Sequence, residues 1–242
     1  MSNGTTVMDY VGRGTLAARP ATPPNVAGGT SFYYATDVSP KVVFIWDGAA
    51  WQNAAAAAYD WNPDDAVIGG MFISPVDGKT ISSLYNAAGD TSIRGFASHA
   101  AASGKFYFEF LVKAVSNTHF PVIGVGLAAA DLFSFTGHDA NAYGIGMGGT
   151  SWTNNATQAQ NTYAAADVAG VAVDFTAATG SIKFFKNNAA QTNAYTSLTL
   201  GTMFPMCGFR GNTAAAQAKG TLRLRAADQT YAPPAGYSAW SS

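Results

Sequence analysis

The sequence predicts an all-β protein in which an antiparallel β-sandwich follows a small β-rich N-terminal segment. Short apolar runs are separated by Gly, Pro, Asn and Asp turn signals, and helical periodicity is nowhere sustained. The clearest run is 104–113, in which the side chains alternate with a period of two. Phe106 and Phe108 fall on one face of this extended strand, and Glu109 falls on the other. Half-buried strands at such spacing are typical of two packed sheets.

Further strands are predicted along the second region of the chain. Residues 122–127 form a near-continuous apolar run with glycines that let backbones approach closely, which indicates a central strand. In 143–148 every second residue is glycine, so the larger side chains share one face. Residues 171–175 and 181–186 are predicted to form a hairpin with a Gly-terminated loop. The 221–225 run alternates apolar and cationic residues, which favours a solvated or edge strand.

The composition restricts the partners that the protein can take. Charged residues make up 11% of the 242 residues and the formal net charge is −1, against roughly a quarter charged residues in an average protein. A chain with so few charges and a net charge so close to zero is not expected to attract nucleic acid or an anionic membrane. The N-terminus lacks a secretory signal, and no apolar run approaches the length of a membrane span. We therefore expect a protein made in a cytoplasm, with no membrane insertion.

The first part of the chain, 1–58, differs from the rest, and we expect the sandwich to occupy 59–242. Two aromatic strand signals, at 32–37 and 42–51, are separated by Pro, Gly and Asp, and the Asp47-Gly48 dipeptide predicts a tight turn. The short alanine run that ends this part is interpreted as a linker. So small a segment buries too little apolar surface to offset its ordering entropy. It is expected to need copies of itself, the larger domain or another protein.

Four motifs in the second region resemble the SPRY family of concanavalin-like β-sandwiches. The order of the motifs is the same as in that family, and the resemblance covers roughly 61–242. Asn188 replaces the glycine that usually closes the last motif. The resemblance implies a concanavalin-like, SPRY-like β-sandwich. The motifs are Gly-Lys-Phe-Tyr-Phe-Glu at 104–109, Ile-Gly-Val-Gly at 123–126, the strand 167–175 and the hairpin 179–188.

Other segments resemble bacteriophage proteins. The ending 233–240 is similar to the tail of phage members of the SPRY group, and 14–20, 33–37 and 47–51 look like segments that recur in phage tail-fibre and head-fibre proteins. The resemblance implies a virion appendage, displayed on the particle exterior, whose N-terminal anchor trimerises or docks onto other virion proteins of the tail or capsid. The residues expected to make this attachment are Leu16, Arg19, Phe32, Tyr33, Tyr34, Trp46 and Trp51.

Glycoside hydrolysis would need a second carboxylate about 5 to 10 Å from the first. Glu109 is the single glutamate of the chain, and Asp174 on a neighbouring predicted strand is the candidate partner. The competing interpretation makes Glu109 a solvated or Arg-paired residue on a sheet face. Because no Glu-x-Asp-x-Glu arrangement is present, we predict no catalytic residues and no cofactor.

Metal and thiol chemistry are also weakly indicated. The three histidines, His99, His119 and His138, show no metal-ligand spacing, and each is expected to lie in a loop by chance. Oxygen ligands for calcium are available at Asp131, Asp139 and Asn141, but without the spacing of a calcium loop, so no metal site is predicted. The single cysteine, Cys207, lies in an apolar stretch and is expected to be a buried, inert thiol.

Two predicted loops, 131–139 and 148–155, combine aromatic and polar residues that suit sugar recognition. An indole at Trp152 would pack against a sugar ring while neighbouring amides supply hydrogen bonds. The alternative is that the aromatic residues plug the ends of the sandwich or pack against another subunit. The candidate ligand-binding residues are Trp152, Asn154, Asn155, Phe133, Phe135 and His138.

The leading hypothesis is a non-enzymatic bacteriophage structural protein, a fibre or decoration subunit, that adheres to a host-surface glycan or protein. We expect a homo-oligomer, specifically a trimer, because the N-terminal strands cannot form a core alone. A SPRY-type peptide-binding adaptor without a virion role is one alternative, and a glycan hydrolase is another.

Overall fold

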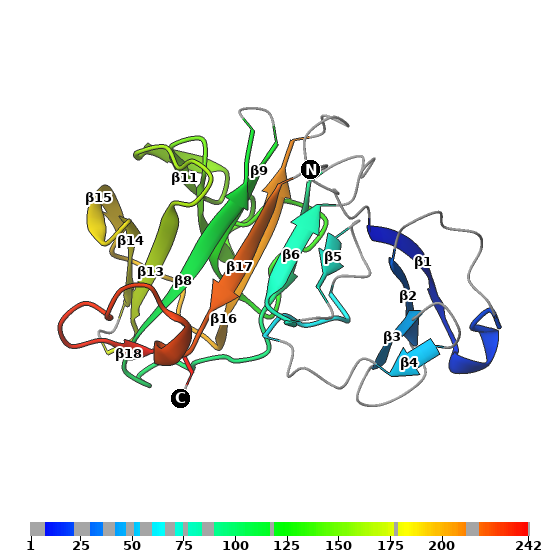
Figure 1. Ribbon diagram of the computed structural model, residues 1–242. Coiled ribbons are helices and arrows are strands. Elements are labelled where there is room, and N and C mark those ends of the chain that lie inside the picture. The colour runs from blue at the N-terminus through cyan, green and yellow to red at the C-terminus, as the bar shows by residue number, and fades with distance from the viewer. Residues whose placement is uncertain are drawn as a thin grey trace. The chain divides into compact units, whose positions relative to one another are not determined.

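The structure is a computed structural model. It describes residues 8–21, 30–35, 42–46, 51–53, 60–65, 71–74, 77–83, 90–116, 119–176, 179–211 and 218–241. The chain forms two compact units, one comprising 1–58 with 75–77 and the other comprising 59–74 with 78–242 (Figure 1).

The N-terminal unit contains a four-stranded sheet in the order β1-β2-β3-β4. β2 pairs antiparallel with β3 and β3 with β4, whereas β1 pairs parallel with β2. β1 was not predicted, because its sequence lacks the alternation that marked the aromatic strands. The tight turn predicted at 47–48 and most of the alanine linker lie outside the described residues. The strands are β1 (Met8–Gly14), β2 (Thr30–Ala35), β3 (Val42–Trp46) and β4 (Trp51–Asn53).

The residues predicted for attachment lie on this sheet and beside it. Leu16 begins a single 3-10 turn, η1 (Leu16–Ala18), and Trp46 pairs with Trp51 across β3 and β4. Tyr33 is buried, and its hydroxyl donates to the backbone carbonyl of Thr15 at 2.8 Å. The role of these residues in attachment stays a prediction.

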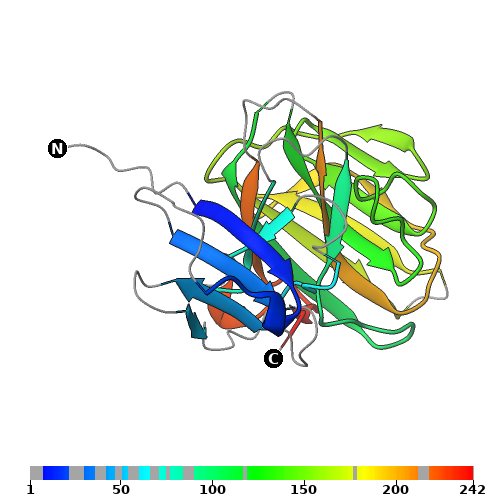
Figure 2. The same ribbon diagram turned by 90° about the vertical axis from the view of Figure 1, so that its right-hand side faces the viewer.

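The larger unit is a β-sandwich of two stacked sheets (Figures 1 and 2). The first sheet has six strands in the order β12-β11-β10-β9-β16-β7, all paired antiparallel. β9 lies between β10 and β16, which confirms the predicted central strand. The strands are β7 (Thr91–Arg94), β9 (Phe120–Leu127), β10 (Ala142–Gly146), β11 (Thr150–Thr153), β12 (Ala156–Ala159) and β16 (Met203–Arg210).

The second sheet has eight strands, seven of them in the order β15-β14-β13-β8-β17-β6-β5. The predicted hairpin is confirmed as β13 and β14, which pair antiparallel. The last strand, β18 (Ser238–Ala239), pairs parallel with the start of β8. The others are β5 (Met71–Ile73), β6 (Thr80–Ser83), β8 (Lys105–Ala114), β13 (Val168–Asp174), β14 (Ser181–Lys186), β15 (Ala189–Tyr195) and β17 (Lys219–Arg223).

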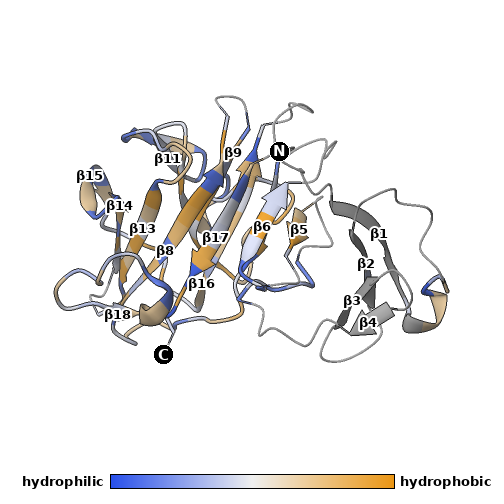
Figure 3. Ribbon diagram, in the orientation of Figure 1, coloured by the Kyte–Doolittle hydropathy of each residue, from blue (hydrophilic) through white to orange (hydrophobic). Residues whose placement is uncertain are grey.

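The core lies between the two sheets and follows the period of two in the sequence. Phe108 and Phe110 of β8 point into it, together with Ile123 of β9 and Val171 of β13, and all four are fully buried. Figure 3 shows apolar residues concentrated along β8 and β13. Each such side chain stabilises the fold by about 1.5–3 kcal/mol. The predicted sandwich is therefore confirmed.

Residues 221–225 were predicted to form a solvated or edge strand, and the edge alternative is wrong. β17 lies between β8 and β6 in the interior of its sheet. Leu222 faces the core, and the neighbouring Arg223 pairs with a buried carboxylate on the other face. An alternation of apolar and cationic residues indicates two different faces, but not which strands flank the segment.

Both sheets are covered on their outer faces by irregular segments. Residues 128–141, which we call the β9–β10 loop, cover the six-stranded sheet. Residues 226–237, which we call the C-terminal strap, join a 3-10 turn, η2 (Ala226–Asp228), to β18 and lie against β8. In the described residues, no helix is long and apolar enough to span a bilayer.

Candidate binding surface

The β9–β10 loop lies directly on the six-stranded sheet because glycines on the strands leave space for its backbone. A Cβ at Gly144 would lie 2.5 Å from the carbonyl oxygen of Thr136, and one at Gly208 would lie 2.7 Å from the Thr136 nitrogen. The Ser92 hydroxyl of β7 also donates to the Ser134 carbonyl at 2.6 Å. Real Cβ atoms do not approach this closely, so the glycines and the loop fit only together. The loop is thereby fixed on a rigid sheet.

Carboxylates inside the loop hold its shape through hydrogen bonds. The Asp139 carboxylate accepts the backbone N–H groups of Asp131 at 3.0 Å and Asn141 at 3.2 Å, and the Asn141 side-chain amide at 3.2 Å. The Asp131 carboxylate accepts the Phe133 N–H at 2.9 Å. N–H donors therefore occupy oxygens that a calcium ion would use. In the part of the chain that the structure describes, no three His, Cys, Asp or Glu residues are grouped as metal ligands would be.

The prediction that Trp152 offers an exposed plate to a sugar is wrong. The Trp152 side chain is 3% exposed, and that of Phe135 is 4% exposed. Trp152 lies on β11, not in a loop, and packs with Val122 and Phe135 beneath the β9–β10 loop. The packing interpretation is confirmed for these two residues, because the loop covers what would otherwise be an open sheet face.

The loop keeps two candidate residues at the surface. Phe133 is 72% exposed, and His138 is exposed while its ring packs edge-on against Phe135 at 5.5 Å between centroids. An exposed phenyl ring costs solvation free energy of about 1.5–3 kcal/mol relative to a buried one. A short loop that buries Phe135 and exposes Phe133 therefore has one ring left for contact with another molecule.

Asn154 and Asn155 form the two-residue turn that joins β11 to β12. Both have positive φ, +49° and +58°, which asparagine tolerates in tight hairpin turns. Their backbone N–H groups donate to the carbonyls of Asp139 at 2.9 Å and Gly137 at 3.2 Å. The fold thus brings the exposed asparagine turn against the loop that carries Phe133 and His138, as the sequence alone could not show.

Arg210, at the end of β16, was not predicted as part of any site. Its guanidinium carbon lies 4.6 Å from the ring centroid of Phe135 and 5.0 Å from that of Trp152. Cations so placed over aromatic rings gain about 0.5–2 kcal/mol. Nothing in the sequence around Arg210 marks it, because the rings it contacts are more than fifty residues away in the chain.

Glu109 lies on the other sheet and is not placed for hydrolysis. It is fully buried, and its carboxylate accepts the backbone N–H groups of Thr230 at 2.6 Å and Tyr231 at 2.9 Å and the Tyr107 hydroxyl at 3.2 Å. The Arg223 guanidinium lies 3.7 Å away. The expectation of an arginine partner is confirmed, but that of a solvated carboxylate is wrong because the C-terminal strap covers it.

The proposed second carboxylate, Asp174, pairs with Lys105 at 2.8 Å instead. In the β8–β13 register Glu109 faces Gly170, four residues from Asp174, or about 13 Å at the rise of a strand. Burial acts to raise the pKa of Asp174, but hydrogen bonds from Lys105 and Thr176 outweigh it and lower the pKa. An ionised, paired Asp174 at this separation makes the hydrolase alternative unsupported by geometry.

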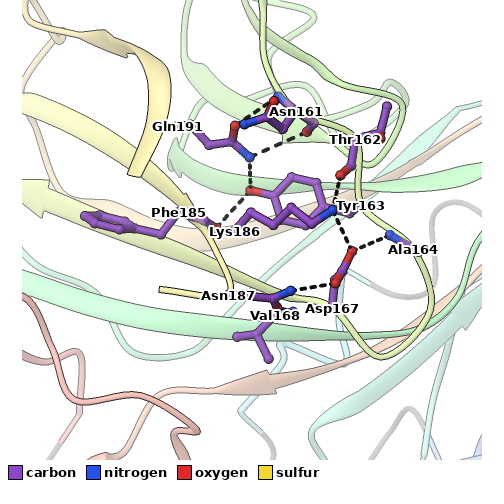
Figure 4. Close-up of polar contacts among 10 residues, drawn as sticks. All are labelled: Asn161, Thr162, Tyr163, Ala164, Asp167, Val168, Phe185, Lys186, Asn187 and Gln191. Carbon is purple, nitrogen blue, oxygen red and sulfur yellow. Dashed lines mark hydrogen bonds and ion pairs between the residues drawn. The ribbon is translucent and has the colours of Figure 1, made fainter. Parts of the chain in front are cut away.

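A third polar cluster, at the side of the sandwich, ties the segment before β13 to the β14–β15 hairpin (Figure 4). Asp167 bonds Lys186 at 3.1 Å and the Asn187 amide at 2.7 Å. The Tyr163 hydroxyl donates to the Phe185 carbonyl and accepts from Gln191, both at 2.9 Å. Burial raises the pKa of Tyr163 above its usual range. The donors and acceptors of this cluster satisfy one another, which indicates a structural role.

His99 and His119 lie in the segments that connect strands, as predicted, and both pack against the sandwich. His99 stacks on Phe106 with 3.3 Å between ring centroids and bonds the Trp240 carbonyl at 2.8 Å. His119 is 5% exposed, and its ring nitrogens have no hydrogen-bond partner among the described residues. Burial lowers the pKa of both, although Trp240 opposes this at His99 and Asp90 does so at His119. Their contacts are those of core residues.

Cys207 is fully buried on β16, as predicted. Burial raises the pKa of its thiol well above the usual value. A thiol that is neither ionised nor accessible is a poor nucleophile.

Comparison with known proteins agrees with this fold. The SPRY domain family model matches residues 105–221, from the start of β8 into β17. The crystal structure of the SPRY domain of human HERC1 is similar to the chain with a TM-score of 0.56 and 13% sequence identity, covering 71% of this chain and 99% of that one. At so low an identity the likeness shows the fold alone. None of the curated proteins compared with the sequence matches it significantly.

The larger unit is therefore a SPRY-like β-sandwich, as the sequence motifs predicted. The bacteriophage origin and the virion location stay predictions.

Proposed function

We propose that the chain is a non-enzymatic structural protein of a bacteriophage particle, a fibre or decoration subunit whose SPRY-like sandwich adheres to the host surface. The β9–β10 loop is the contact surface. The observation that carries the proposal is the 72% exposure of Phe133 on a loop whose backbone is fixed to the sheet. A rigid, exposed aromatic residue binds a partner at low cost in conformational entropy.

The arrangement of carboxylates supports binding rather than catalysis. Glu109 is buried under the C-terminal strap, and Asp174 pairs with Lys105. Catalytic carboxylates must reach both solvent and substrate. Turnover of bacterial polysaccharides by the purified chain would contradict a purely adhesive role.

The virion location rests on the resemblance of the N-terminal segments to phage fibre proteins. In this proposal the four-stranded sheet of the N-terminal unit is the anchor, and residues such as Trp46 and Trp51 contact further copies or other virion proteins. A trimer is expected because a sheet this small has little core of its own. Light scattering of the full chain should give a trimeric mass, and a monomeric mass would contradict the anchor model.

The direct test of the proposal has two parts. Mass spectrometry of purified particles should find this chain among the virion proteins, and its absence from particles would end the virion hypothesis. In an adhesion assay on host cells, Phe133→Ala should weaken attachment of the full chain. Phe96→Ala is a matched control, because Phe96 is 55% exposed but lies outside the loop.

The peptide-binding adaptor remains the second candidate, favoured by the match of the SPRY family model to 105–221. Phe133 would then insert into a partner protein rather than contact a cell surface. Capture of one defined protein partner, lost in Phe133→Ala and found in cells that carry no particles, would favour this alternative.

A further inference from the structure

Arg210 is held at the surface by two buried aromatic rings. The rings of Phe135 and Trp152 lie 4.6 and 5.0 Å from its guanidinium carbon, and both rings are nearly fully buried. Phe120, the register partner of Arg210 on β9, stacks on Trp152 in turn, with 6.5 Å between ring centroids. Arg210 as a whole is half-buried, so the aliphatic part of its side chain is fixed while the edge of the guanidinium reaches solvent. We call Phe120, Phe135 and Trp152 the aromatic base.

Within the part of the chain that the structure describes, the donors of this guanidinium have no protein acceptor. Among the described residues, the Arg210 side chain forms neither an ion pair nor a hydrogen bond, and the nearby Asp90 carboxylate accepts the Gly211 N–H at 2.9 Å instead. Several other cations of the sandwich pair with carboxylates, as Arg94 does with Asp65 at 2.8 Å. A guanidinium carries five N–H donors in a planar fork that matches a carboxylate.

We infer that Arg210 is the anchor of a subsite for a carboxylate group of an acidic host-surface glycan. This inference rests on the proposed adhesive function and names the class of ligand. The planar fork would bind the carboxylate in bidentate fashion, and the aromatic base would hold the fork in place. His138 packs on the same Phe135 ring and is exposed, so a second nitrogen group borders the subsite.

A sugar chain suits the surrounding surface better than a peptide does. The exposed Asn154 and Asn155 turn is bonded to the β9–β10 loop and offers neutral amides to sugar hydroxyls. An extended peptide would pair with an open strand edge. β16, which carries Arg210, lies in the interior of its sheet. On β7, the edge strand beside it, the Ser92 N–H already donates to the Leu132 carbonyl at 3.0 Å and the Arg94 carbonyl accepts the Asn62 N–H at 2.7 Å.

The experiment measures binding of the full chain to a panel of uronic-acid and sialic-acid oligosaccharides, each paired with its carboxyl methyl ester. We expect at least one acid to bind while its ester binds about tenfold more weakly or worse. Arg210→Gln, which keeps a polar side chain but removes the charge, should lose this preference for the acid. Lys183→Ala, at an exposed cation on β14 of the other sheet, is the control and should retain it.

Three results would overturn the inference. They are the absence of ester-sensitive binding across the whole panel, an equal loss of binding in Lys183→Ala, and tighter binding of an aspartate-rich peptide than of any acidic sugar.

Thermal melting of each variant checks that its fold is intact, and Arg210→Lys provides a second variant that keeps the charge but lacks the planar fork. Host-cell adhesion is scored separately. If Arg210→Gln still adheres to host cells although acid-sensitive sugar binding is absent, the carboxylate subsite is contradicted but the adhesive function is not. If the wild-type chain does not adhere, the proposed function itself is contradicted.

Discussion

The carboxylate of Glu109 accepts the backbone N–H of Thr230 at 2.6 Å, which ties the C-terminal strap to the middle of the eight-stranded sheet. The second oxygen does the same for Tyr231 at 2.9 Å. A charged acceptor with paired N–H donors forms strong hydrogen bonds when it is buried. The single glutamate of the chain is therefore a structural clamp.

Replacing Glu109 with glutamine should destabilise the fold by about 3 kcal/mol. The amide of Gln would turn a donor toward the N–H groups of the strap and leave Arg223 without its carboxylate. Urea unfolding measures the loss, and limited proteolysis should cut the strap sooner. Asp228→Asn is the control on the same strap, since its ion pair with Lys79 is partly exposed and should cost about 1 kcal/mol or less. Equal stability of the two variants would contradict the clamp.

Trp152→Ala and Phe133→Ala should affect stability very differently. The first removes a buried indole from beneath the β9–β10 loop and should cost about 3–5 kcal/mol. The second removes an exposed ring and should change the free energy of unfolding by less than about 0.5 kcal/mol. Thermal melting distinguishes them. A large loss of stability in Phe133→Ala would mean that its ring is packed and not free for a partner.

Gly208→Ala should loosen the loop from the sheet. The new methyl group would meet the Ser92 hydroxyl at 2.5 Å, the Thr136 nitrogen at 2.7 Å and the Phe135 Cα at 2.8 Å. Such overpacking costs roughly 1–3 kcal/mol. In Gly148→Ala the methyl would find only ordinary contact with Phe120 at 3.5 Å, so this variant serves as control. Faster amide exchange of the loop in both variants alike would argue against close backbone packing as the cause.

Stability should fall as the pH drops below about 6.5, because two histidines are packed as neutral groups. Burial lowers the pKa of His99 and His119 in the folded state, so the unfolded chain takes up protons first. The loss begins near the unfolded pKa of about 6.5 and levels off below the folded pKa. The depressed pKa values of Asp167 and Asp174 act in a lower window, as pH falls below about 4.

Urea unfolding at several pH values between about 7 and 5 measures this slope. His119→Phe, which keeps an aromatic ring at the buried position, should reduce the slope. His138→Gln, at an exposed position, should leave it unchanged. A flat profile in the wild-type chain would show that neither imidazole is constrained by burial.

The sandwich could be predicted because its strands carry a local signal. The alternation in 104–113 placed Phe108 in the core, and the glycines of 122–127 predicted close backbone approach. Gly124 is approached by the Tyr143 carbonyl of the neighbouring β10, whereas Gly144 is approached by the Thr136 carbonyl of the β9–β10 loop, which the sequence pattern did not show. Local periodicity reports the two faces of a strand, but not what covers them.

The candidate site was only partly predictable for the same reason. The exposure of Phe133 and the burial of Trp152 are set by the way a loop folds back over the sheet. Arg210 joins the aromatic rings through strand pairing across the sheet, which leaves no mark in its neighbours along the chain. The position of β17 between β8 and β6 is likewise a long-range property.

Because Cys207 is buried, chemical labelling of its thiol reports unfolding of the protein. The chain has one cysteine, it lies fully inside the sandwich, and a thiol reagent reaches it only when the sheets separate. The labelling rate under native conditions then counts openings of the sandwich itself, without any added fluorophore. The Cys207 labelling rate can therefore be compared between variants of the strap, the loop and the binding residues.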